Sequence, residues 1–165
     1  MRTEELVNCI VTFLNEIGIR VVFDTIDEPT FLPGILINCG GLRVDQSKLD
    51  YPGDLLHEAG HIAVKLPGDR LQMYGDAAEG GMGDEIGAML WSYAAIKVLN
   101  LPEEIVFHAG GYRGHSSWLV DHFREKQNYI GLPLLEWMGM TAGPEKAKML
   151  GVPPYPHMIH WLRPS

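Results

Sequence analysis

Apolar residues recur every three or four positions over residues 3–17, which is the spacing of one face of an α-helix. The residues on this face are Leu6, Cys9, Ile10, Phe13, Leu14 and Ile17. Gly18 follows them, and glycine after the last periodic position is a typical helix stop. The pattern predicts an N-terminal helix that packs against a core through this face.

Three short apolar runs come next, at residues 19–23, 34–38 and 42–45. They are rich in β-branched residues and are too short for stable helices, so they are interpreted as strands. The second and third runs flank Cys39-Gly40-Gly41, and a glycine pair at this place is typical of a tight turn. The sequence therefore predicts a small sheet built around a hairpin or a bent strand pair.

Two further helices are predicted in the middle of the chain. Residues 54–66 are apolar on one face and polar on the other, and Pro67-Gly68 ends the run. Residues 67–83 are rich in Gly and Asp and are expected to form a long connection. Residues 84–99 are apolar on most sides, as in a helix buried against others.

The rest of the chain offers helical stretches near 103–109, 116–127 and 132–139, followed by a Pro-rich tail. No internal repeat, low-complexity segment or linker divides the sequence. We therefore expect a single α+β domain over residues 1–165, in which a small mixed sheet packs against the helix of residues 54–66. Residues 1–100 form its core and residues 101–165 a helical C-terminal extension.

Composition narrows the class of protein. With 165 residues, the chain is long enough to bury a core without disulfides. No apolar run reaches the roughly 18 residues of a membrane span, so a soluble protein with no membrane partner is expected. The net charge of −8 and the lack of a basic cluster argue against direct nucleic-acid binding. The N-terminal segment lacks a signal-peptide cleavage site, which favours a cytoplasmic location. The oligomeric state is left open.

Residues 57–61 read His-Glu-Ala-Gly-His on the polar side of a predicted helix. Residues four apart on a helix lie one above the other, so His57 and His61 can present ring nitrogens to one ion about 2.0 Å from each. Glu58 then stands beside the ion, where it can accept a proton from a metal-activated water. The pattern indicates one Zn²⁺ per chain. The alternative is a helix with a structural pair of histidines.

A catalytic zinc ion usually has three protein ligands and a water molecule. A third histidine at the spacing His-Glu-x-x-His-x-x-Gly-x-x-His is absent, because Val64 and Pro67 occupy the required positions. Glu85, near the start of the next helix, is the favoured third ligand, and its neighbours Asp84 and Glu79 could replace it. An acid in a first helical turn also has a structural interpretation, as a partner for the helix dipole.

Two other segments hold candidate residues. Cys39 follows a strand, as the zinc ligand of peptide deformylases does, but the other deformylase segments are absent, and a core or loop thiol is the preferred interpretation. The stretch FHAGGYRGHSSW contains Tyr112 and His115. Either side chain, placed over a metal, could stabilise an oxyanion. The alternative is a glycine-rich turn with solvated polar residues.

Residues 3 to about 99 resemble the ImmA/IrrE-type family of zinc metallopeptidases, which has a zincin-like fold. The resemblance lies in the N-terminal helix, the short strand and the segment PGILINCGGLRVDQSKLDYPGDLLHEAGHIAV. It implies a cleft whose edge strand pairs with an extended peptide. The edge strand would be formed by Ile35, Leu36, Ile37 and Asn38. One departure is Met89, which stands where thermolysin-like relatives place an Asp that orients a histidine.

These observations favour a zinc-dependent hydrolase, and within that class a metalloendopeptidase that cleaves a peptide or protein substrate with zinc-activated water. Two alternatives stay open: a non-catalytic zincin-like binding module, and a metal-dependent hydrolase of a small amide. Glu58 argues against the binding module, because a purely structural metal site needs no general base. The sequence does not identify the substrate.

Overall fold

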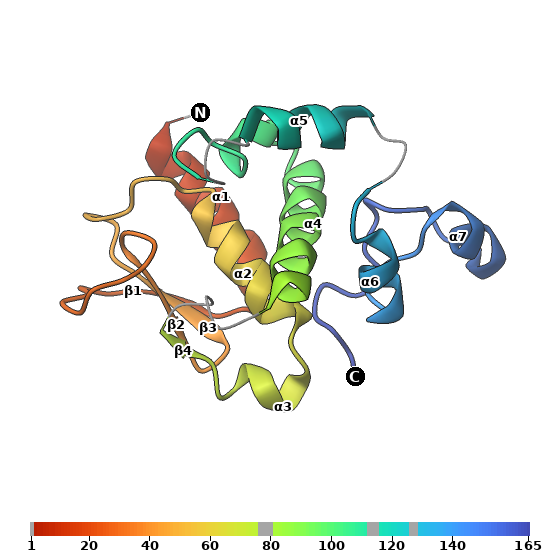
Figure 1. Cartoon of the computed structure of the whole chain (residues 1–165). Helices are drawn as coiled ribbons and strands as arrows, with labels where there is room; N and C mark the ends of the chain where they lie inside the picture. The colour runs from red at the N-terminus through yellow and green to blue at the C-terminus, as the bar shows by residue number, and fades with distance from the viewer. Residues whose placement is uncertain (1, 76–80, 112–115, 126–128) are drawn as a thin grey trace.

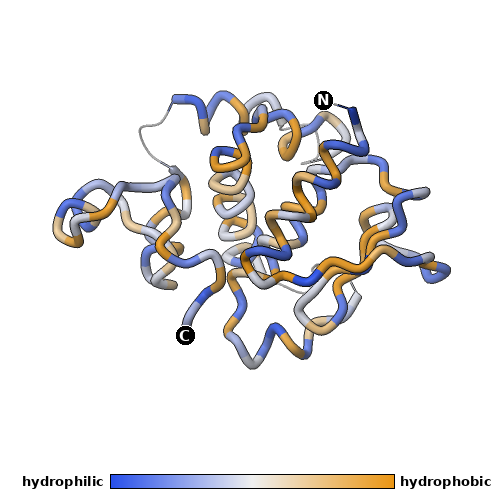
Figure 2. The backbone as a smooth tube through the Cα atoms, turned by 180° about the vertical axis from the view of Figure 1, so that it is seen from behind, coloured by the Kyte–Doolittle hydropathy of each residue, from blue (hydrophilic) through white to orange (hydrophobic). Residues whose placement is uncertain are grey.

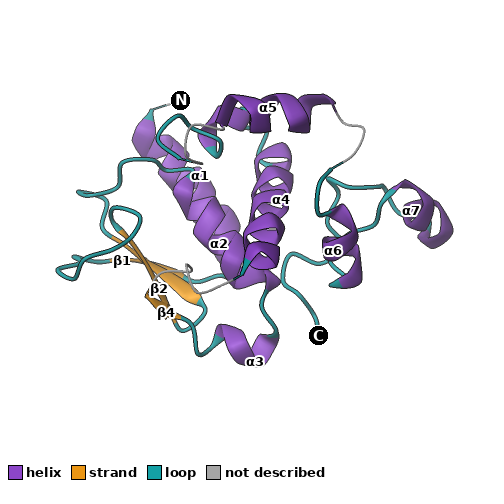
Figure 3. Ribbon diagram, in the orientation of Figure 1, coloured by secondary structure: helices purple, strands orange, loops and turns teal. Residues whose placement is uncertain are grey.

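A computed structural model describes residues 2–75, 81–111, 116–125 and 129–165 (Figure 1). The fold is α+β, with one small mixed sheet and helices on either side of it in the sequence (Figure 3). Its elements are α1 (Thr3–Glu16), β1 (Val21–Phe23), β2 (Ile35–Asn38), β3 (Gly41–Val44), α2 (Asp54–Val64), α3 (Pro67–Arg70), β4 (Tyr74–Gly75), α4 (Met82–Val98), the 3₁₀ helix η1 (Glu103–Ile105), α5 (Ser116–Glu125), α6 (Leu132–Trp137) and α7 (Pro144–Leu150).

The sheet has the strand order β1-β3-β2-β4. β2 and β3 form the expected hairpin, and the turn between them uses positive φ angles at Cys39 (50°) and Gly40 (75°). β1 runs parallel to β3, whereas β4 pairs with β2 in the antiparallel sense. The predicted strands and the predicted helices at residues 3–17, 54–66 and 84–99 are thus confirmed, within a few residues at each end.

The edge of the sheet differs from the prediction. β2 was expected at the accessible edge, but it lies between β3 and β4. In the register of the β2–β4 pair, Ile37 stands opposite Gly75 and Asn38 opposite Tyr74. The outermost described strand on this side is therefore β4, and only Ile35 and Leu36 of β2 have no β4 residue opposite them. The prediction was wrong here because two residues inside a Gly-rich connection carry no strand periodicity.

The helices α2 and α4 lie side by side at the centre of the molecule (Figure 1). Nearly all of α2 is buried, and Trp91 of α4 is fully buried. Figure 2 shows that the hydrophobic stretches gather in the central helices and the sheet, while the outer loops are largely hydrophilic. The C-terminal tail is hydrogen-bonded to both helices. Trp91 Nε1 of α4 donates to Trp161 O at 2.8 Å, and Arg163 N donates to Ala63 O of α2 at 2.9 Å.

The C-terminal part contains η1, α5, α6 and α7. Two details differ from the sequence-based expectation. The stretch near 103–109 forms only the short η1, and the tail contains the helix α7, which was not predicted. Across the described parts of the chain, no helix is both long and apolar enough to cross a bilayer.

Gly60 sets the distance between α2 and α4. A Cβ atom at Gly60 would lie 2.7 Å from Ala88 O and 2.9 Å from Ala88 Cα. Real Cβ atoms do not approach so closely, and the obstructing atoms are backbone, which cannot rotate away. Glycine at this position therefore permits direct backbone contact between the two helices. The contact lies close to His57 and His61, because Gly60 stands between them on α2.

Gly60→Ala is expected to reduce the free energy of unfolding by about 1–3 kcal/mol through overpacking. The clash with α4 outweighs the gain in helix propensity, which is at most about 1 kcal/mol. Urea denaturation of the parent and the variant measures the difference. Gly68→Ala is the matched control, because a Cβ at Gly68 would meet no atom within 4 Å. Equal stability of Gly60→Ala and Gly68→Ala would contradict the close approach.

Candidate metal centre

A stripe of polar residues runs along α2, whose other faces are buried and apolar. The stripe consists of Asp54, His57, Glu58 and His61, at the spacing of one helical face. Glu58 is only 5% exposed and His61 only 3% exposed. Burying polar groups is unfavourable unless they have partners. A concentration of such groups inside a packed helix pair therefore marks a site.

Three side chains converge at the centre of this stripe. The Nε2 atoms of His57 and His61 are 3.1 Å apart. Glu85, from the first turn of α4, places Oε1 3.3 Å from His57 Nε2 and Oε2 3.2 Å from His61 Nε2. Four ligands held tetrahedrally at zinc bond lengths of about 2.0–2.1 Å are separated from one another by about 3.3 Å. The three side chains thus have the mutual spacing that one small tetrahedral ion requires.

Glu58 lies next to these ligands. The potential ligand atoms of His57, Glu58 and His61 all lie within 4.8 Å of one another. The carboxylate of Glu58 is therefore within reach of a small molecule bound at the same centre. Two carboxylates, those of Glu58 and Glu85, thus lie beside the two histidines.

The charge of the site is set by Glu85. A hydrogen bond with His57 and a second one with His61 hold the pKa of Glu85 well below its usual range. Its carboxylate is therefore ionised at neutral pH. The side chain of Glu85 is 47% exposed, whereas that of His61 is 4% exposed. The centre is therefore anchored in the interior on the side of α2, while the side chain contributed by α4 is partly exposed to solvent.

The other third-ligand candidates are placed elsewhere. Asp84 forms an ion pair with Lys65, which occupies its carboxylate. Cys39 lies in the turn between β2 and β3, where its N–H donates to Met73 O. Glu79 lies outside the described residues, as do Tyr112 and His115. Within the described parts of the chain, Glu85 alone of these acids and thiols meets both histidines.

Comparison of the chain with protein-family models, with curated proteins and with solved structures gives no match. The resemblance noted in the sequence thus stays a prediction. Assignment of the centre depends on its own geometry, in which His57, His61 and Glu85 come from two helices held together at Gly60.

A second polar contact extends the stripe by one helical turn. Asp54 Oδ1 lies 2.7 Å from Nε2 of His108, whose ring stacks on Tyr51 with 3.8 Å between ring centroids. Burial raises the pKa of Asp54, and the hydrogen bond to His108 opposes this rise. Asp54 was not among the site residues predicted from the sequence, although it stands three residues before His57 and thus on the same face. Its pairing with His108 had no local signal.

Proposed function

We propose that this protein is a zinc-dependent hydrolase with a zincin-like fold, and that it is a metalloendopeptidase. The observation that carries the proposal is the convergence of His57, His61 and Glu85 at mutual distances of 3.1 to 3.3 Å, with Glu58 beside them. A structural zinc site is normally closed by four protein ligands. Three protein ligands, of which Glu85 is partly exposed, favour a catalytic centre instead.

In this proposal, His57, His61 and Glu85 hold the ion. Zinc, when bound, acidifies a coordinated water molecule and polarises a carbonyl group. Glu58 accepts the proton of the attacking water and returns it to the leaving amine, as a general base and then a general acid. Its burial at 5% exposure keeps this carboxylate in a fixed position.

The family and the substrate class belong to the same proposal. The order of N-terminal helix, small sheet, His-Glu-x-x-His helix and a following helix with Glu85 supports membership of the ImmA/IrrE-type metallopeptidases. A peptide or protein substrate then follows from the family resemblance. The two departures from the expected pattern are Met89 and the covering of part of β2 by β4.

Zinc-dependent cleavage of a denatured protein mixture tests the proposed activity. The purified protein is expected to generate new peptide termini, to lose this activity in a strong chelator and to regain it when zinc is restored. Cleavage that continues in the chelator would contradict a metal-dependent mechanism.

Glu85→Gln is expected to weaken zinc binding by about 10²-fold or more, because loss of a direct ligand exceeds the 10–100-fold effect known for residues that only orient ligands. Competition with a fluorescent chelator measures this affinity. The matched control is Asp84→Asn, which removes the same charge from the adjacent residue and should keep the affinity of the parent, since Asp84 pairs with Lys65. If only Asp84→Asn loses zinc, the third ligand is wrongly assigned.

A further inference from the structure

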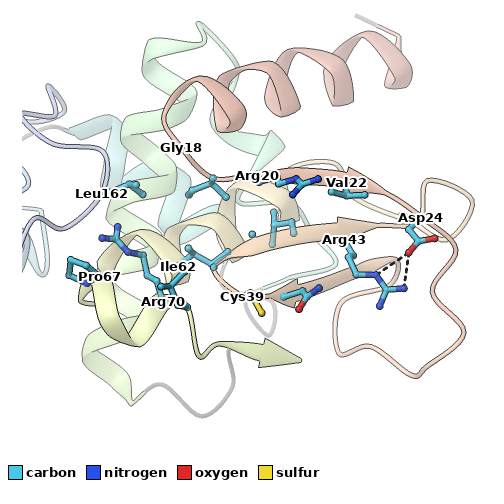
Figure 4. Close-up of a pocket in the computed structure, with 16 residues that line it drawn as sticks. Gly18, Arg20, Val22, Asp24, Cys39, Arg43, Ile62, Pro67, Arg70 and Leu162 are labelled. Atoms are coloured by element: carbon cyan, nitrogen blue, oxygen red, sulfur yellow. Dashed lines mark hydrogen bonds and ion pairs between the residues drawn. The ribbon is translucent and has the colours of Figure 1, made fainter.

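A pocket of about 730 Å³ lies outside the metal centre. It is bounded by the segment leading into β1, the turn between β2 and β3, helix α3 and the C-terminal tail (Figure 4). Helix α2 contributes Ile62 to its lining, but none of the four residues of the proposed catalytic centre lines it. Pockets of 300–1,000 Å³ are typical of small-molecule sites. The pocket is therefore large enough for a ligand of its own.

The floor of the pocket is aliphatic. Ile19, Leu42 and Ile62 close it from the core side and are at most 2% exposed, so the apolar area that a ligand can cover comes from Leu71 and Val22, which are 69% and 38% exposed. Leu162 of the C-terminal tail adds to the same apolar surface. A surface of this kind binds the hydrocarbon part of a ligand through removal of apolar area from water.

The rim of the pocket is basic. It carries Arg20, Arg43 and Arg70 against a single acid, Asp24. Arg43 is neutralised, because its guanidinium pairs with Asp24 at 3.0 Å and with Glu28 at 3.3 Å. The dashed lines of Figure 4 mark the contacts with Asp24. The balance of charge at the pocket thus depends on the other two arginines.

Neither Arg20 nor Arg70 has a carboxylate partner among the described residues. Nη2 of Arg70 donates to the backbone oxygen of Arg163 at 3.2 Å, and Nη1 is buried without a hydrogen bond. Burial lowers the pKa of Arg70, as expected for a cation without a compensating anion. In Figure 4, Arg70 and Arg20 lie on two sides of the pocket, and Ile62 lies between them in this view.

The charge at this pocket contrasts with that of the whole chain. The chain carries a net charge of −8, so carboxylates are in excess. Six of the eleven Lys and Arg residues in the described parts of the chain form an ion pair with an acidic side chain, namely Arg2, Arg43, Lys48, Lys65, Lys97 and Arg124. Two arginines that flank one apolar pocket without acidic partners therefore leave a local positive field, which attracts an anion from solution.

We propose that this pocket binds a small organic anion that has an apolar body and a carboxylate or phosphate headgroup. The apolar body packs on the exposed side chains of Leu71 and Val22, and the headgroup compensates the charge of Arg20 and Arg70. The guanidinium group suits both headgroups, because its planar fork of donors matches carboxylate and phosphate oxygens. The site does not depend on the proposed metal centre.

Calorimetric titration of the full chain with decanoate, decyl phosphate and neutral decanamide tests this proposal. The anion with the preferred headgroup is expected to bind at least about 10-fold more tightly than decanamide, since charge-assisted hydrogen bonds are about twice as strong as neutral ones. Whichever of decanoate and decyl phosphate binds more tightly identifies the headgroup. If neither anion binds more tightly than decanamide, the proposal is wrong.

Variants locate the charge that is responsible. Arg70→Gln and Arg20→Gln should each reduce the affinity for the preferred anion by about 5- to 50-fold and leave that for decanamide unchanged. Arg124→Gln is the matched control, because it removes the same charge from α5, where Arg124 pairs with Glu104. An equal loss in Arg124→Gln and Arg70→Gln would mean that only the overall charge matters, and would overturn the proposal.

Cys39 provides an independent test of position. Cys39 lines the pocket and is an exposed, free cysteine. A ligand in the pocket should slow alkylation of Cys39 by neutral iodoacetamide several-fold, as measured by mass spectrometry of the peptide that contains it. Binding of the anion with no change in the alkylation rate of Cys39 would place the ligand elsewhere and contradict the proposed site.

Discussion

His61→Ala is expected to lower the affinity for zinc by more than about 10²-fold, beyond the effect of losing a residue that merely orients a ligand. His61 is the most buried member of the centre, with 3% of its surface exposed, and its Nε2 faces both His57 and Glu85. Without it, one histidine and one carboxylate from different helices are left. The zinc content of the purified protein and competition with a chelator measure the loss.

His57→Ala should behave in the same way, because its Nε2 completes the same triangle. The matched control is His160→Ala, which removes an exposed histidine from the C-terminal tail and should keep one zinc ion per chain. Circular dichroism of each variant separates loss of the ligand from loss of the fold. Equal zinc content in the parent, His57→Ala and His61→Ala would contradict the metal centre.

Glu58→Gln is expected to retain zinc while hydrolysis falls by about 10²- to 10⁴-fold, the usual contribution of a positioned general base. The substitution keeps the size and shape of the side chain and removes only its ability to accept a proton. This result distinguishes Glu58 from the histidines, whose loss should abolish both binding and activity. It therefore separates an enzyme from a binding module that has kept the same metal site.

A cell lysate provides the substrates for this measurement. New peptide termini are scored after incubation with the parent and with Glu58→Gln, and a panel of small amides covers the alternative substrate class. Glu104→Gln is the matched control, because Glu104 is exposed and its carboxylate pairs with Arg124 of α5. If zinc is bound and no product depends on Glu58, the binding module becomes the better interpretation.

The local elements could be predicted from the sequence because their signals are local. The apolar face of residues 3–17 and the apolar run of residues 84–99 specify helices through spacing alone, and α1 and α4 are found there. The pairing of β4 with β2 could not be predicted. It joins residues 36 or more positions apart, and β4 contains only Tyr74 and Gly75. Such a contact is decided by the packing of the whole chain.

In the candidate site, too, the residues on one helix could be predicted and the contact between two helices could not. His57 and His61 follow from the helical repeat, because one helix carries both. The choice between Asp84 and Glu85 could not be made with certainty from sequence, since adjacent helical residues point about 100° apart and the facing one depends on how α4 packs. In the structure, Lys65 pairs with Asp84, and Glu85 meets the histidines.

The contact between Asp54 and His108 could be predicted only in part. The stripe on α2 includes Asp54 by its spacing, so periodicity alone could have added it to the site. Its partner is 54 residues away, in the stretch near 103–109 that was predicted to be helical and forms only the short η1. Only the packing of residues 107–111 against the start of α2 brings the two side chains together.

Anomalous scattering from a crystal of the zinc-loaded protein would locate the ion itself. We expect a single strong zinc peak about 2.0–2.2 Å from Nε2 of His57, Nε2 of His61 and a carboxylate oxygen of Glu85, with one position left open. A peak bound by other residues, or no peak at this centre in protein that carries one zinc ion per chain, would contradict the proposed metal centre.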